Sequence, residues 1–230
     1  MKTVIDRANT RGHADYGWLN TWHTFSFADY YNPQRIHFGA LRVLNDDTVT
    51  PGMGFDTHPH KNMEVISIPL KGYLRHGDSL EHSEVISPGD IQVMSTGSGI
   101  YHSEFNDSKT ENLEFLQIWV IPRVNNTKPV YKSYDIRQVD MKNRFGYIVA
   151  PGGILQDAWF ALGKLEKGKK IGYHLHQKNT GVYCFVIEGE ICIEGTDLSR
   201  RDGMGITETD HFQVEARSEA YVLLIEVAMI

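Results

Sequence analysis

Four side chains in the first half of the chain have the types and the spacing of a transition-metal site. His58 and His60 lie two residues apart, and His102 and Glu104 repeat that spacing on a later segment. Side chains alternate between the two faces of a β-strand, so each pair points to one side of its strand. If the two strands come together, three imidazoles and one carboxylate converge. Such a donor set predicts a divalent transition metal with coordination positions left for a substrate or dioxygen.

The donor types narrow the class of metal. Imidazole suits iron, nickel, copper and zinc, and a single carboxylate adds charge compensation. Fe(II) is the first expectation, and Ni, Co, Mn, Cu and Zn are compatible with the same donors. A closed structural zinc site more often contains cysteine, and Cys184 and Cys192 lie far away in one predicted hairpin. We expect both cysteines to be buried free thiols in a cytoplasmic protein.

Glu64 is the alternative carboxylate ligand, because it follows His60 on the same predicted segment. Otherwise its carboxylate is expected to accept a hydrogen bond from a ligand imidazole and to fix the tautomer of that ring. Three apolar residues are candidates either for the wall of the site or for ordinary packing: Phe55, Met63 and Ile100.

Composition argues against two classes of partner. The chain carries 29 acidic and 23 basic residues, for a net charge of −6, without a block of like charge. Nucleic-acid binding through a basic surface is therefore not expected. No apolar run approaches the length of about 18 residues that spans a membrane, and the N-terminal residues lack the apolar segment of a signal peptide.

The segments that must position the candidate ligands are short and rich in β-branched and aromatic residues. Strands are predicted at Phe38–Leu44, Glu64–Leu70, Ile91–Met94, Leu113–Ile121, Val182–Glu188, Glu190–Glu194 and Tyr221–Val227. The nearly continuous apolar run at 113–121 is typical of a strand buried on both faces. Glu188 and Gly189 predict a tight hairpin. Many short strands without a long helical period indicate an all-β sandwich or barrel.

The second half of the chain repeats this pattern weakly. His174 and His176 have the same spacing as the first histidine pair, about half the chain length later, and His211 follows them as His102 follows the first pair. We therefore expect two copies of one β-domain, at residues 1–130 and 131–230.

The second set of histidines leaves two interpretations open. Thr180 and Gln213 stand where the first copy has its two glutamates, so the carboxylate is missing. Three imidazoles can still bind a metal, and the alternative is an empty polar pocket.

The remaining histidines are assigned to the scaffold. His13, His23 and His37 lie among aromatic residues and are expected to be hydrogen-bonded structural residues, whereas His76 and His82 flank a polar turn and are expected at the surface.

Taken together, the motifs of the N-terminal half resemble those of the pirin family of bicupins. The resemblance spans residues 7–122 and is carried by Arg11–His13, Trp22–Phe27, Leu41–Asp46, Thr57–His60, His76–Asp78, Met94–Glu104 and Gln117–Trp119. It implies two cupin-type β-barrels packed face to face, metal ligands at His58, His60, His102 and Glu104, and a C-terminal copy without metal.

The resemblance to bacterial pirins also implies quercetin 2,3-dioxygenase activity. The expected reaction is cleavage of a flavonol ring by dioxygen, with Glu104 as the general base for the substrate hydroxyl. The expected partners are a small aromatic substrate and O2, with a monomer or a homodimer as the assembly. The alternative that the family implies is a non-catalytic, metal- or redox-sensitive module that regulates a partner protein. A cup large enough for a bicyclic ligand favours the enzyme.

Overall fold

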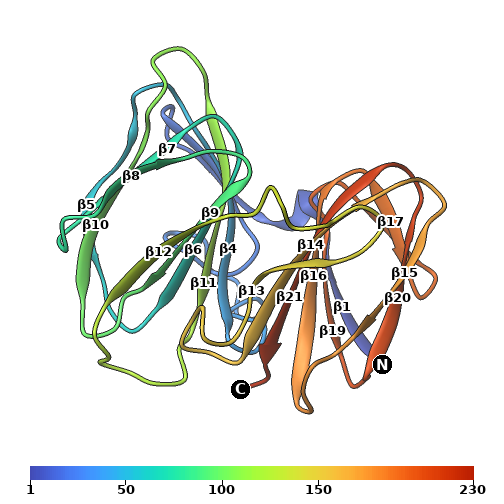
Figure 1. Ribbon diagram of the computed structural model, residues 1–230. Coiled ribbons are helices and arrows are strands. Elements are labelled where there is room, and N and C mark those ends of the chain that lie inside the picture. Colours follow the sequence, from blue (N-terminus) through green and yellow to red (C-terminus); the bar gives the residue numbers. More distant parts are fainter.

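The structure is a computed structural model that describes residues 1–230 and consists almost entirely of β-strands. Its one helix is the short 3₁₀ turn Ala8–Thr10, so no helix is long and apolar enough to cross a membrane. Four sheets form two barrels side by side (Figure 1). The expected all-β bicupin architecture is confirmed.

The first barrel combines a seven-stranded and a four-stranded antiparallel sheet. The large sheet has the order β12-β9-β6-β11-β4-β3-β2. Its strands in chain order are β2 (Gly12–Asp15), β3 (Leu19–His23), β4 (Leu41–Val49), β6 (Glu64–Lys71), β9 (Asp90–Ser95), β11 (Leu113–Val120) and β12 (Val130–Asp135). The small sheet has the order β5-β10-β7-β8. Its strands are β5 (Gly54–His60), β7 (Leu74–Asp78), β8 (Ser83–Ile86) and β10 (Ile100–Asn106).

The second barrel repeats this design with a six-stranded and a four-stranded sheet. The large sheet has the order β1-β19-β16-β21-β14-β13. Its strands are β1 (Lys2–Asp6), β13 (Gly146–Val149), β14 (Ala158–Leu165), β16 (Thr180–Glu188), β19 (Gly203–Thr207) and β21 (Ala220–Ala228). The small sheet has the order β15-β20-β17-β18. Its strands are β15 (Lys170–His174), β17 (Glu190–Ile193), β18 (Thr196–Ser199) and β20 (His211–Ala216).

The two large sheets pack against each other, which explains the continuous apolar runs in the sequence. One face of β11 or β21 lines a barrel, and the other face packs against the neighbouring barrel, so both faces need apolar side chains. The largest hydrophobic cluster contains 25 buried residues and includes Ile66 and Ile118 from the first barrel and Phe160, Phe185 and Ile225 from the second. The core that joins the barrels is thus larger than the core inside either one.

The domain limits expected at residues 1–130 and 131–230 stay a prediction, and two strands lie across them. The strand β12 begins at Val130 and pairs with β9, so the first barrel extends to Asp135. The first strand of the chain, β1, pairs instead with β19 of the second barrel. Figure 1 shows this N-terminal strand within the second barrel. Each expected half therefore supplies one strand to the barrel that is built mainly from the other half.

The local predictions hold, except that one strand begins three residues later than expected. The hairpin at Glu188 and Gly189 joins β16 to β17, and Cys184 and Cys192 are buried and free. The strand expected from Phe38 starts at Leu41, because a turn at Gly39, with a positive φ of 52°, interrupts the apolar run.

Candidate metal centre

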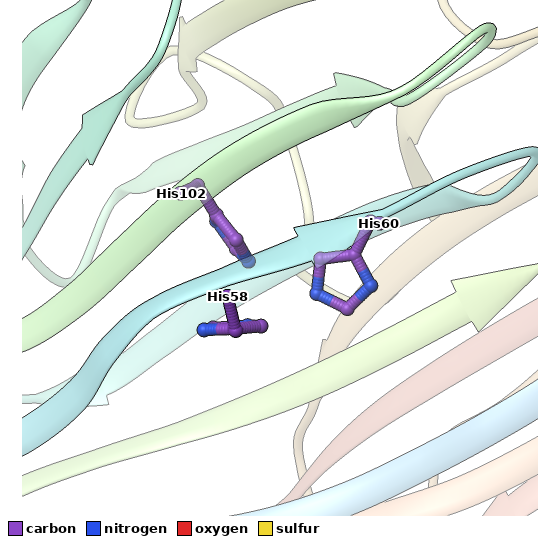
Figure 2. A group of neighbouring side chains, drawn as sticks. All are labelled: His58, His60 and His102. Carbon is purple, nitrogen blue, oxygen red and sulfur yellow. The ribbon is translucent and has the colours of Figure 1, made fainter.

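The pairing of β5 with β10 brings three of the predicted ligands together. In this antiparallel register His102 lies opposite His58. His60 lies two residues further along β5, on the same face of the strand. The ligand nitrogens of the three side chains lie within 4.8 Å of one another, and the ring centroids are 4.5 to 4.8 Å apart. Figure 2 shows the three rings converging from the two strands. The expected convergence of the histidines is therefore present.

The hydrogen bonds of these rings fit a bound cation. His102 is 1% exposed, and neither of its ring nitrogens has a hydrogen-bond partner. A buried polar atom without a partner is unfavourable, and a metal ion would satisfy one of these nitrogens. The Nδ1 atom of His58 donates to the carbonyl oxygen of Asp56 at 2.7 Å. That bond fixes the tautomer and leaves Nε2 free as a ligand.

Burial also places two of the rings in the protonation state that metal binding requires. It lowers the pKa of His60 to about 4, with a further contribution from His58. Burial likewise lowers the pKa of His102 to about 2, helped by the neighbouring His58, His60 and His76. Both imidazoles are neutral at pH 7, and only a neutral imidazole can donate its lone pair to a metal.

Glu104 lies on β10, where the β5 register shifts between it and His102, and it faces the same barrel interior. Its side chain accepts hydrogen bonds from Ser67 Oγ at 2.9 Å and from Gln117 Nε2 at 2.6 Å. Burial nevertheless raises the pKa of Glu104 to about 7, because these two bonds offset the loss of hydration only in part. The carboxyl group can therefore bind or release a proton near neutral pH.

Glu64, the alternative ligand, makes different contacts. Its Oε2 atom accepts hydrogen bonds from Ser95 Oγ and from the backbone N–H of Leu155 at 3.2 Å. Leu155 precedes β14, so Glu64 joins the first barrel to the segment leading into the second. Glu64 is absent from the lining of the cavity described below. Neither carboxylate belongs to the group that the three histidines form, but Glu104 lines the cavity beside them and Glu64 does not. Glu104 as a metal ligand stays a prediction.

A cavity of about 220 Å³ opens beside the histidines. His58, His60 and Glu104 form one part of its lining. Its apolar wall consists of Tyr16, Leu19, Phe27, Ala28, Phe55 and Trp119. Phe55 thus has the expected position. Met63 and Ile100 do not, because they pack into a separate small hydrophobic cluster.

Sequence reasoning missed the polar wall of this cavity. The side chains of this wall come from β3, β4 and β11 and are Thr21, His23, Asn45, Asp47 and Gln117. The expectation that His23 is only structural was incomplete: its Nδ1 lies 2.9 Å from Asn45 Oδ1, and the ring also lines the cavity. A signal was available, because Asn45 and Asp47 occupy alternate positions of one strand and therefore share a face.

The prediction of a surface position for His76 was wrong. The residue is 0% exposed, and its ring stacks on Tyr131 and lies 5.5 Å from the ring of His102. Its Nε2 atom lies 3.1 Å from a carboxylate oxygen of Asp78, which also contacts His82. The hydrogen bond to the nearby Asp78 carboxylate offsets the cost of burying this imidazole, although the sequence of the segment is typical of a polar turn.

The corresponding histidines of the second barrel do not form a group of this kind. His174 and His211 lie opposite each other on β15 and β20, both exposed, with ring centroids 5.6 Å apart. The Nδ1 atom of His176 instead lies 2.7 Å from Glu226 Oε2, and its ring stacks on Trp159. The His176 imidazole therefore contacts Glu226 and Trp159 and does not join the other two histidines. That the second barrel binds no metal stays a prediction.

Two β-barrels pack their large sheets face to face, and one of them gathers three histidines beside a cavity that a buried glutamate also lines. This arrangement defines a bicupin with a candidate metal centre. The pirin family model matches residues 4–120, and the model of the quercetinase C-terminal cupin domain matches residues 151–227. The chain belongs to the pirin family.

Individual relatives match along nearly the whole chain. The quercetin 2,3-dioxygenase of Escherichia coli strain K12 is 38% identical over 229 residues, which cover 97% of each chain. A pirin-like protein of Caulobacter vibrioides is 35% identical, covering 98% of this chain and 100% of the relative. The crystal structure of the bacterial pirin YhhW from Escherichia coli in complex with nickel(II) superposes with a TM-score of 0.94, at 36% identity and with 100% of each chain covered.

Proposed function

We propose that this protein is a metal-dependent dioxygenase that cleaves the ring of a flavonol such as quercetin with O2. The observation that carries the proposal is the placement of three imidazoles and a buried, hydrogen-bonded carboxylate beside an aromatic-walled cavity. The name of the 38% identical relative from Escherichia coli supports the same reaction.

The residues that would hold the metal are His58, His60, His102 and Glu104. When bound, a divalent metal lowers the pKa of a coordinated hydroxyl and orders the reactants around it. Fe(II) remains the first expectation, and nickel is supported by the nickel(II) complex of the Escherichia coli relative.

Glu104 has a second role in this proposal, as the acceptor of the proton from the substrate 3-hydroxyl. Burial raises the pKa of Glu104 to about 7 without a metal, and a coordinated cation lowers it. Glu104 would therefore accept this proton when its carboxylate is free of the metal or only weakly bound to it. Ser67 and Gln117 each donate a hydrogen bond to one of its two oxygens. These contacts hold the carboxylate plane in a fixed orientation toward the cavity.

The cavity wall selects the shape of the substrate. Phe55 and Trp119 offer aromatic surfaces on which a flat ring can pack. The volume of about 220 Å³ is below the range of about 300–1,000 Å³ typical of small-molecule sites. The space therefore favours one flat aromatic compound, with its outer ring near the mouth, over a peptide or a sugar chain.

The test uses protein purified without a metal-affinity tag and loaded with one metal at a time. Loss of the quercetin absorbance and consumption of dioxygen are followed together. We expect turnover by the wild type and losses of about 10²- to 10⁴-fold for Glu104→Gln, the range typical of a general base. His60→Ala should lose both metal and activity. The matched control is His174→Ala, an exposed histidine of the second barrel, which should behave as wild type.

The same experiment separates the enzyme from a regulatory binding module. A metal-loaded wild type that leaves flavonols intact while consuming no dioxygen contradicts the dioxygenase. Capture of a protein partner that is lost on chelation would then support the regulatory module.

A further inference from the structure

Asp47 is a second buried carboxyl group in the cavity, and the proposed reaction does not use it. The residue lies on β4, is 3% exposed, and lines the same cavity as Glu104. Its Oδ1 atom has no hydrogen-bond partner. Thr21, opposite on β3, bonds to the side chain, but burial still raises the pKa of Asp47 to about 7. An unpartnered buried carboxyl oxygen opposes folding, so its presence here points to a ligand.

His23 adds a second acceptor on the neighbouring strand. Its Nδ1 atom lies 2.9 Å from the amide oxygen of Asn45, which can only accept. The ring hydrogen therefore sits on Nδ1, and Nε2 keeps a lone pair. His23 also lines the cavity. This part of the wall therefore offers two hydrogen-bond acceptors, His23 Nε2 and Asp47 Oδ1, and a ligand that fits it carries hydrogen-bond donors.

The acceptors and the metal ligands belong to different walls of the barrel. Asp47 and His23 lie in the seven-stranded sheet, whereas the histidine group and Glu104 lie in the four-stranded sheet. A ligand that binds the histidine group of the small sheet with one end can therefore contact Asp47 and His23 of the large sheet with another edge.

We propose that Asp47 and His23 form a subsite that accepts hydrogen bonds from phenolic hydroxyl groups of the substrate remote from the metal. The inference rests on the proposed function and names the substrate class within it: a polyhydroxylated flavonol, bound in preference to one whose only hydroxyl is the metal-binding one.

The test compares quercetin with 3-hydroxyflavone, which lacks every hydroxyl of quercetin except that at position 3. Binding to the metal-loaded protein is measured without oxygen, by quenching of tryptophan fluorescence, and turnover is measured separately. The variants are Asp47→Asn and Asp47→Leu. Asp107→Asn, an exposed acid of the same barrel, is the matched control. Thermal unfolding of each metal-free variant is recorded alongside.

At pH 8, above the raised pKa of Asp47 of about 7, a hydrogen bond to the charged carboxylate predicts that wild type binds quercetin at least about tenfold more tightly than 3-hydroxyflavone. Asp47→Leu should abolish this preference by weakening quercetin binding far more than 3-hydroxyflavone binding, and Asp47→Asn should reduce it. Asp47→Leu should also unfold at a higher temperature, because it removes an unpartnered buried carboxyl; a residue with only a structural role would lower it.

Three outcomes contradict the subsite, and the first two leave the dioxygenase untouched. If wild type turns over both flavonols and Asp47→Leu keeps the wild-type preference, the subsite is wrong and the dioxygenase stands. If Asp47→Leu weakens both ligands equally, Asp47 shapes the cavity and does not read hydroxyl groups. A wild type that neither binds nor consumes either flavonol overturns the proposed function and this inference together.

Discussion

At the scale of single residues, the environment of Glu104 decides what the cavity can do. A carboxylate beside a cation is ordinarily ionised well below neutral pH. Here burial raises the pKa of Glu104 to about 7 in the metal-free protein. In the proposed function, the same side chain exchanges a proton before the metal binds and serves as an anionic ligand afterwards.

Metal binding should release a proton from Glu104 in a pH-dependent way. With a pKa of about 7, the metal-free carboxyl group is about 90% protonated at pH 6 and about 10% protonated at pH 8. The contribution of Glu104 to proton release should therefore fall from about 0.9 to about 0.1 proton per metal. Calorimetric titration in buffers of different ionisation enthalpy measures it. Identical proton release by wild type and Glu104→Gln at both pH values would contradict the assignment.

The same raised pKa makes a prediction about folding. A group whose pKa is higher in the folded state favours folding below its unfolded pKa of about 4.5, and this contribution is lost as the pH rises through about 7. Relative to Glu104→Gln, the metal-free wild type should lose about 3 kcal/mol of unfolding free energy between pH 4.5 and pH 8. Urea unfolding at both pH values checks this. A difference between the two proteins that does not change with pH would show that folding does not raise the pKa of Glu104.

At the scale of elements, the site depends on how closely β5 approaches β10. The β-period of the sequence was sufficient to predict that His58 and His60 share a face and that His102 joins them. It was not sufficient to predict the register shift before Glu104 or the polar wall of β3 and β4, because local pattern does not specify which strands pair across a barrel. His76 and His23 were misjudged for the same reason: their partners, Tyr131 and Asn45, lie on distant segments.

Gly54 allows the close approach of these two strands. A Cβ atom at this position would clash with the backbone of Glu104 and Phe105. Gly54→Ala should therefore separate β5 from β10 and weaken metal affinity by at least about tenfold, with a loss of stability of about 1–3 kcal/mol. Metal-binding titration and denaturant unfolding measure the two effects. Gly172→Ala is the control, since that glycine of β15 has nothing within 4 Å of an added Cβ. Wild-type metal affinity in Gly54→Ala would show that the strand spacing does not set the site.

At the scale of the whole molecule, the two barrels share one core. The sequence predicted two copies of a β-domain, and the structure has them. The position of β1 in the second barrel was not predictable, because the sequence of a short strand does not specify which strand it pairs with. Comparison of matched positions also indicated that the second copy lacks a carboxylate. The structure supplies one from an unmatched position, Glu226 on β21, where it accepts a hydrogen bond from Tyr173 and contacts His176.

A shared core predicts that both barrels unfold together. Phe160 is fully buried in the cluster that joins them, so Phe160→Ala should destabilise the protein by about 3–5 kcal/mol. Its calorimetric transition should remain single, with equal calorimetric and van't Hoff enthalpies. Tyr31→Ala, at a residue 74% exposed, should change stability by no more than about 0.5 kcal/mol. Two separate transitions in the wild type would show that the barrels are independent units.

One metal ion should bind between β5 and β10. Elemental analysis of protein purified without a metal-affinity tag, before and after loading, tests it most directly. We expect about one equivalent of a divalent transition metal in wild type and in His174→Ala, and less than about a tenth of that in His102→Ala. Full metal occupancy in His102→Ala, or no uptake by wild type, would contradict the account.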